Sequence, residues 1–124
     1  MRKILVRAIL LVDQKPSTAI LMKTYLAAAG YDVDHTPDPQ EALEFASQLQ
    51  YQVVITDLVM QGMSGIDLYR EIKSCNIHTS FVFLLTLSAD ALKLMGSLER
   101  DDVIKKEPLS MNEVIQKVRA AFAS

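Results

Sequence analysis

Residues 52–65, Gln-Val-Val-Ile-Thr-Asp-Leu-Val-Met-Gln-Gly-Met-Ser-Gly, decide the fold of this 124-residue chain. The run Gln52–Asp57 is short, apolar in its middle and rich in β-branched residues, which predicts a strand buried on both faces of a sheet. A loop containing Gly62 and Gly65 follows, and residues 66–72 have the spacing of a helix. An acidic side chain therefore stands at the carboxyl end of a buried strand.

The same alternation of a short apolar run with a longer helical pattern occurs five times along the chain. The predicted strands are Ala8–Val12, Tyr31–Thr36, Gln52–Asp57, Phe81–Leu85 and Val103–Lys106. The predicted helices are Pro16–Leu26, Pro39 to about Leu49, Ile66–Ile72, Ala89–Leu98 and a last one after Ser110 that reaches Phe122. Alternating strands and helices are typical of a parallel sheet with helices on its faces. We therefore expect one α/β domain over residues 1–124, in which residues 1–7 are an extension or part of the first strand.

Several residues are expected to begin or end helices. Asp38–Glu41 and Ser110–Glu113 have the spacing of capping boxes, and Pro39 suits the first position of its helix. Gly30 can adopt the left-handed conformation that ends the first helix.

Composition excludes several classes of protein. The 13 basic and 15 acidic residues are interspersed and give a net charge of −2, which argues against direct binding to nucleic acid. Cys75 is the only cysteine, so an intramolecular disulfide is impossible, and a reducing cytoplasm fits best. No stretch approaches the roughly 20 apolar residues needed to cross a membrane. Arg7 and Asp13 interrupt and end the first apolar run, so export is not expected.

Polar side chains stand at the carboxyl ends of four predicted strands. They are Asp13, Asp57, Thr86 and Lys106. Functional groups of open parallel sheets collect at this edge, so we expect the four to meet there. Carboxylates suit Mg2+ and can act as phosphoryl acceptors, while lysine and a hydroxyl stabilise the oxygens of the transferred group.

Each of these residues also has a simpler interpretation. Asp57 could cap the turn that follows it, and Asp13 could cap the first helix. Lys106 could be an exposed edge-strand lysine, and a slip of one residue would exchange it with Lys105. Thr86 is a candidate only because of its position after a strand, since threonine is common in strands.

Five ordered segments carry a resemblance to a known family. They are Ile9–Asp13, Ile55–Met60, Gly62–Gly65, Leu84–Thr86 and Asp102–Lys106. In this order they resemble the motifs of receiver domains of two-component response regulators, the CheY-like superfamily. The resemblance implies a (βα)5, doubly wound, parallel five-stranded sheet in the order 2-1-3-4-5, a flavodoxin-like receiver fold.

The resemblance also implies a function and roles for residues. Asp57 would accept a phosphoryl group from a histidine kinase or phosphotransfer protein, with Thr86 as the switch hydroxyl and Lys106 paired with the phosphate. Mg2+ would be held by Asp13, Asp57 and the backbone carbonyl of Val59. The domain would be a cytoplasmic phosphoprotein of a phosphorelay, a switch rather than an enzyme, with at most Mg-dependent autophosphorylation and slow autodephosphorylation. The fourth helix, fifth strand and fifth helix would bind the downstream protein; a homodimer stays open.

Departures from the family pattern favour an alternative, a degenerate receiver that binds partners without phosphorylation. Gln14 stands where the family has a second acid, so we expect weaker Mg2+ binding, with Gln14 at best a weak and doubtful ligand. The other departures that favour it are Leu87 for a small residue, Val103 for an aromatic one, and Glu107 inserted before Pro108. Gln61 also replaces a usual proline, and we expect it to loosen the loop after Asp57 only modestly.

The remaining residues with reactive side chains are expected to have ordinary roles. His35 and His78 lack metal-ligand spacing and are expected at the surface, and Cys75 is expected to be a small packing residue. A flavin-binding redox protein is a third hypothesis for the same sheet. It is disfavoured because no Ser/Thr/Gly-rich phosphate loop follows the first predicted strand.

Overall fold

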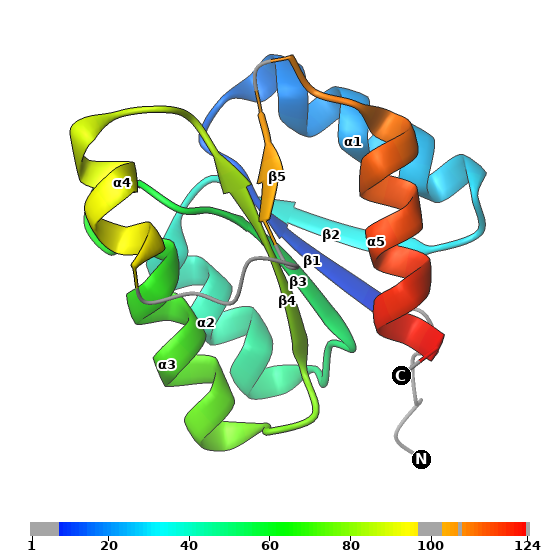
Figure 1. Ribbon diagram of the computed structural model, residues 1–124. Coiled ribbons are helices and arrows are strands. Elements are labelled where there is room, and N and C mark those ends of the chain that lie inside the picture. Colours follow the sequence, from blue (N-terminus) through cyan, green and yellow to red (C-terminus); the bar gives the residue numbers. More distant parts are fainter. Residues whose placement is uncertain (1–7, 97–102, 107, 124) are drawn as a thin grey trace.

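The computed structural model describes residues 8–96, 103–106 and 108–123 and contains a parallel sheet in the order β2-β1-β3-β4-β5 (Figure 1). The strands are β1 (Ala8–Val12), β2 (Asp32–Thr36), β3 (Val53–Asp57), β4 (Ser80–Leu85) and β5 (Val103–Lys105). All four strand pairs are parallel. The predicted strand order and (βα)5 arrangement are confirmed.

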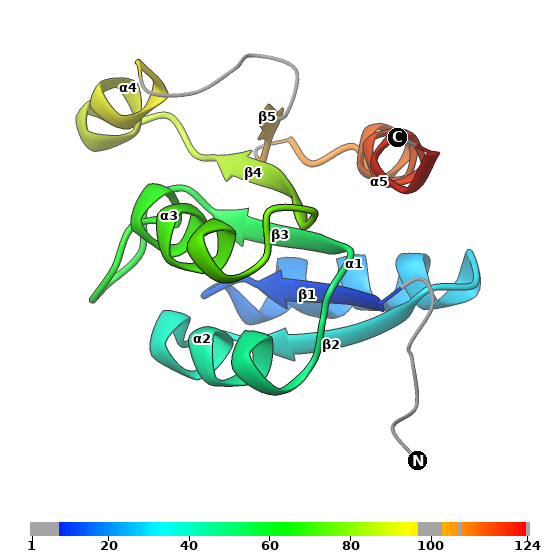
Figure 2. The same ribbon diagram turned by 90° about the horizontal axis from the view of Figure 1, so that it is seen from below.

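Helices cover both faces of this sheet. They are α1 (Pro16–Ala28), α2 (Pro39–Gln48), α3 (Gly65–Cys75), α4 (Ala89–Met95) and α5 (Met111–Ala123). Figure 2 shows α1 and α5 on one face, with α2, α3 and α4 on the other. A doubly wound sheet of this kind leaves the carboxyl ends of its strands free to form a site.

The unbroken apolar strands divide their side chains between two cores. One core, beneath α1 and α5, contains Ile9, Leu11, Val53, Ile55, Val82, Leu84 and Ile104. The other, beneath α2 and α3, contains Leu10, Val12, Val54, Phe81, Phe83 and Leu85. Because successive side chains of a strand point to opposite faces, one apolar run supplies both cores.

The helix ends are set by local hydrogen bonds. Asp38 caps α2 by accepting from the Gln40 N–H at 3.0 Å, one residue earlier than the capping box predicted. Gly30 ends α1 with a φ of 96°, as expected. A full capping box between Ser64 and Asp67 begins α3 and was not predicted.

Some predictions fall on residues outside those that the structure describes. These concern residues 1–7, the last part of the predicted fourth helix (97–98), Asp102 and the inserted Glu107. Within the described residues, every helix is too short or too polar to cross a membrane.

Candidate functional site

Backbone hydrogen bonds carry the sheet one residue beyond its strands and so bring the polar side chains together. The Asp13 N–H donates to the Thr36 carbonyl at 3.3 Å, and the Lys106 N–H donates to the Leu85 carbonyl at 2.8 Å. Asp57 is the last residue of β3, between β1 and β4. Asp13, Asp57 and Lys106 therefore all lie at the carboxyl edge of the sheet.

Lys106 joins the two carboxylates. Its Nζ donates to Asp13 Oδ1 at 2.6 Å and to Asp57 Oδ1 at 2.8 Å. Lys106 is 6% exposed, which contradicts the interpretation of an exposed edge lysine, whereas Lys105 is exposed. The geometry places Lys106 rather than Lys105 at the acids.

Asp13 is fully buried and its carboxylate is occupied. Oδ1 accepts from the Lys15 N–H at 2.9 Å as well as from Lys106, and Oδ2 accepts from the Thr18 hydroxyl at 2.5 Å. Because Lys15 and Thr18 lie at the start of α1, Asp13 organises the beginning of that helix. Asp13 does not cap α1, because the N-cap of this helix is Lys15 and the helix start has no side-chain cap hydrogen bond. Its contact with Lys106 places it beside Asp57.

The electrostatics of Asp57 combine burial with close charges. Burial raises the pKa of Asp57; the hydrogen bonds from Lys106 and the Gln14 N–H oppose this rise, and the charge of Asp13 adds to it. Burial lowers the pKa of Lys106, but hydrogen bonds to Asp13 and Asp57 outweigh it, and the pKa is raised overall. With both carboxyl groups ionised, the two carboxylates and one ammonium carry a net charge of −1, so the ammonium balances one carboxylate and not both.

Gln14 touches Asp57 and two neighbouring loops. Its backbone N–H donates to Asp57 Oδ2 at 2.9 Å, and its side-chain Nε2 donates to the Pro37 carbonyl at 3.2 Å. Its side-chain oxygen accepts from the Gln61 N–H at 3.1 Å. The residue expected to be a weak metal ligand has its amide oxygen bonded to the protein.

Thr86 is not hydrogen-bonded to the other three residues. It follows β4 directly and is exposed, and within the described part of the chain no hydrogen bond links its hydroxyl to the acids or Lys106. Leu87 is 71% exposed, so most of its side chain lies in solvent. Hydrogen bonds therefore join three of the four side chains that were predicted to converge, and Thr86 is not one of the three.

The donor set fits Mg2+ in part. Mg2+ is commonly held by one or two carboxylates and keeps several waters. Asp57 supplies a carboxylate at the rim, and the carbonyl of Val59 lies two residues further along. Asp13 and the Gln14 amide oxygen already accept hydrogen bonds. Among the residues described, no group of three or more His, Cys, Asp or Glu could hold a metal ion.

Two residues at the site have roles that sequence reasoning missed. The ring of His35 bonds the Asp13 carbonyl oxygen through Nε2 at 3.0 Å, so His35 is more than a surface residue. At Gly65, a Cβ would overlap the Asp57 carbonyl oxygen and lie 3.1 Å from Leu58 Cα. Helix α3 can therefore approach β3 only with glycine at this position.

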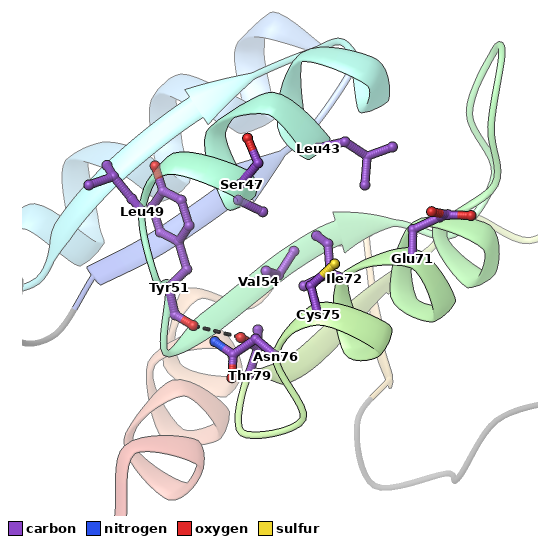
Figure 3. A pocket seen from close by; sticks show the side chains of 11 residues that line it. Leu43, Ser47, Leu49, Tyr51, Val54, Glu71, Ile72, Cys75, Asn76 and Thr79 are labelled. Atoms are coloured by element: carbon purple, nitrogen blue, oxygen red, sulfur yellow. Dashed lines mark hydrogen bonds between the residues drawn. The ribbon is translucent and has the colours of Figure 1, made fainter.

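A hollow lies at the opposite edge of the sheet, between α2 and α3 (Figure 3). The space in and above this hollow amounts to about 390 Å3, part of which is open solvent, and its lining includes Leu43, Tyr51, Ile72 and Cys75. Tyr51 stands just before β3, so this hollow is at the amino end of that strand and contains none of the predicted site residues. Cys75 was expected to be packed, but it is exposed at the end of α3.

Comparisons of the sequence with known proteins identify related proteins. The family model of the response regulator receiver domain matches residues 9–119. The chain is 33% identical over 113 residues to the regulatory protein VanRB of Enterococcus faecalis, and 32% identical over 114 residues to the DNA-binding response regulator MtrA of Mycolicibacterium smegmatis. Each match covers 90% of this chain, and 50% and 49% of those proteins, respectively, so the chain spans about half their length.

Solved structures give the same result. The signal receiver domain of a signal transduction histidine kinase from Syntrophus aciditrophicus superposes with a TM-score of 0.83 at 26% identity, covering 95% of this chain and 91% of that one. The sheet order, the acid at the end of β3 and the match over residues 9–119 together show that this chain belongs to the response regulator receiver domain family.

Proposed function

We propose that Asp57 accepts a phosphoryl group from the phosphohistidine of a histidine kinase or phosphotransfer protein. The observation that carries this proposal is the direct contact of Asp57 with Lys106, 2.8 Å from Nζ to Oδ1, at the carboxyl edge of the sheet. This is the place where ligands bind in open α/β sheets. The rim position of Asp57 and membership of the receiver family support the proposal.

The chemistry requires a free lone pair on the carboxylate. Each Asp57 oxygen accepts one hydrogen bond, from Lys106 or from the Gln14 N–H, and a carboxylate oxygen has about two acceptor sites. One oxygen attacks phosphorus, the bond from phosphorus to the histidine nitrogen breaks, and that nitrogen keeps the electron pair. Lys106 holds positive charge beside the new phosphoryl oxygens. Receiver domains bind Mg2+ at acidic residues near this position, where the ion neutralises charge on the transferred group.

A degenerate receiver is the second candidate, and one observation favours it. The Gln14 amide oxygen accepts from Gln61, and Asp13 accepts three hydrogen bonds and is fully buried. Asp57 is therefore the carboxylate that has acceptor capacity and reaches the rim. With a single such carboxylate, Mg2+ binding should be weaker than in a receiver with two acids after β1. Partner binding without phosphorylation then becomes the function of the domain.

Intact-mass measurement separates the two candidates. The protein is incubated with a small phosphodonor and Mg2+, and the mass of one phosphoryl group should appear in the wild type and be absent from Asp57→Asn. Magnesium titration followed by beryllofluoride should shift resonances near Asp57. A wild type that gains no mass and shows no saturable Mg2+ or beryllofluoride binding contradicts the phosphoacceptor proposal and leaves the degenerate module.

The wider role rests on the same proposal. We place the domain in the cytoplasm, as a switch with a downstream protein that reads α4, β5 and α5, and without direct contact to nucleic acid. During transfer of the phosphoryl group, Lys106 pairs with the phosphate, while Asp13 and the backbone carbonyl of Val59 help to hold Mg2+. Thr86 is proposed to reach the phosphoryl group only after a rearrangement, because its residue is exposed in this structure.

A further inference from the structure

Two departures from the family pattern meet in space. Gln14 replaces an acid and Gln61 replaces a proline, and they are 47 positions apart, yet the Gln61 N–H donates to the Gln14 side-chain oxygen at 3.1 Å. A proline at 61 has no N–H and could not make this bond. The hydrogen bond between residues 14 and 61 therefore requires a residue other than proline at position 61, and the family's acid and proline could not form it.

The Gln14 side chain is a bridge because it uses both ends of its amide. Nε2 donates to the Pro37 carbonyl in the loop between β2 and α2, while the oxygen holds the loop between β3 and α3. The backbone N–H of the same residue holds Asp57 Oδ2. One residue thus ties the phosphoacceptor, its own loop and both flanking loops together.

We propose that Gln14 is a positioning residue that holds the β3–α3 loop, and with it the Val59 carbonyl, in place for Mg2+. Val59 lies between Asp57 and Gln61 on a loop whose far end is fixed by Gly65, through the Gly65 N–H to the Leu58 carbonyl at 2.8 Å. A proline would stiffen this loop through its fixed φ angle. Here a side-chain hydrogen bond replaces that stiffness. This inference rests on the proposed function at Asp57.

The first measurement is amide hydrogen exchange at Gln61, which needs neither Mg2+ nor a phosphodonor. In Gln14→Ala the Gln61 N–H loses its acceptor, so its exchange should be at least about fivefold faster than in the wild type. Gln40→Ala is the matched control, since Gln40 is an exposed glutamine on α2 whose capping bond uses only its backbone N–H. Unchanged exchange at Gln61 would overturn the inference.

The second measurement is the Mg2+ dissociation constant, taken by titration calorimetry in two backgrounds at residue 61. Gln14→Ala should weaken Mg2+ binding about fivefold in the wild-type background. Gln14→Ala should weaken Mg2+ binding equally when it is added to Gln61→Ala, which keeps the backbone N–H at residue 61. It should have no effect when it is added to Gln61→Pro, which lacks that N–H and stiffens the loop. A role in stability alone would lower the urea midpoint and leave the Mg2+ constant of the folded protein unchanged.

The outcomes separate this inference from the proposed function. Tighter Mg2+ binding in Gln14→Ala, an equal effect in the Gln61→Pro background, or no saturable Mg2+ binding by the wild type would overturn it. If the exchange and Mg2+ results hold but Asp57 gains no phosphoryl mass, the phosphoacceptor proposal fails alone. If Gln14→Ala is phosphorylated on Asp57 at the wild-type rate and its Mg2+ dissociation constant equals that of the wild type, the positioning role of Gln14 fails alone.

Discussion

Replacing Lys106 with methionine tests whether one ammonium holds the acidic site together. Nζ lies 2.6 Å from Asp13 Oδ1 and 2.8 Å from Asp57 Oδ1, and Lys106 is 6% exposed. With an effective dielectric constant of about 20, each contact corresponds to about 6 kcal/mol of Coulomb attraction. Desolvation of the ammonium offsets several kcal/mol of this sum, and removing one partner of a buried pair usually costs about 3–5 kcal/mol. We expect Lys106→Met to lower the free energy of unfolding by that amount.

Urea unfolding followed by far-ultraviolet circular dichroism measures the loss. With an m-value of about 2 kcal/mol per M, the midpoint should fall by about 2 M. Lys105→Met is the matched control, because Lys105 is adjacent and exposed, and its midpoint should change little. The deficit of Lys106→Met should shrink at acid pH, where the unpaired carboxylates take up protons, and Asp57→Asn should recover part of it at neutral pH. Equal midpoints for the two lysine variants would refute this account of the site.

Three further predictions concern single positions. Asp57→Asn should raise the free energy of unfolding near pH 7, because burial raises the pKa of Asp57 and the folded state therefore loses stability as pH rises through that pKa. Urea midpoints should show the gain shrinking toward about pH 4, where the unfolded carboxyl also becomes protonated. Gly65→Ala should lower the free energy of unfolding by about 3 kcal/mol or more, because the added Cβ meets the Asp57 backbone. Gly62→Ala should lower it by about 1 kcal/mol, because Gly62 lies in open space but has a φ of 92°. A larger loss of stability for Gly62→Ala than for Gly65→Ala in thermal unfolding would contradict this. Gly96→Ala should stabilise by up to about 1 kcal/mol, because Gly96 has a φ of −60° and room for a Cβ, and a lower melting temperature would show the reasoning to be wrong.

Much of the fold was predictable because its signals are local. Apolar runs of β-branched residues and the capping residue Asp38 specify strands and a helix start within a few residues of themselves. The missed capping box at Ser64 was also readable, since Ser64 and Asp67 have the right spacing, with aspartate in place of the usual glutamate. Strand order followed from the family resemblance and not from periodicity.

The sequence by itself determined that Asp13, Asp57 and Lys106 stand at the ends of strands, because parallel strands bring their carboxyl ends to one edge. Only the tertiary structure decided that Lys106 bonds both acids, that Thr86 faces solvent, and that Gln14 bonds Gln61. The contacts of Lys106 and Gln14 join residues that lie 47 to 93 positions apart. They depend on distances of a few ångströms between separate loops, and no local pattern of residues encodes such distances.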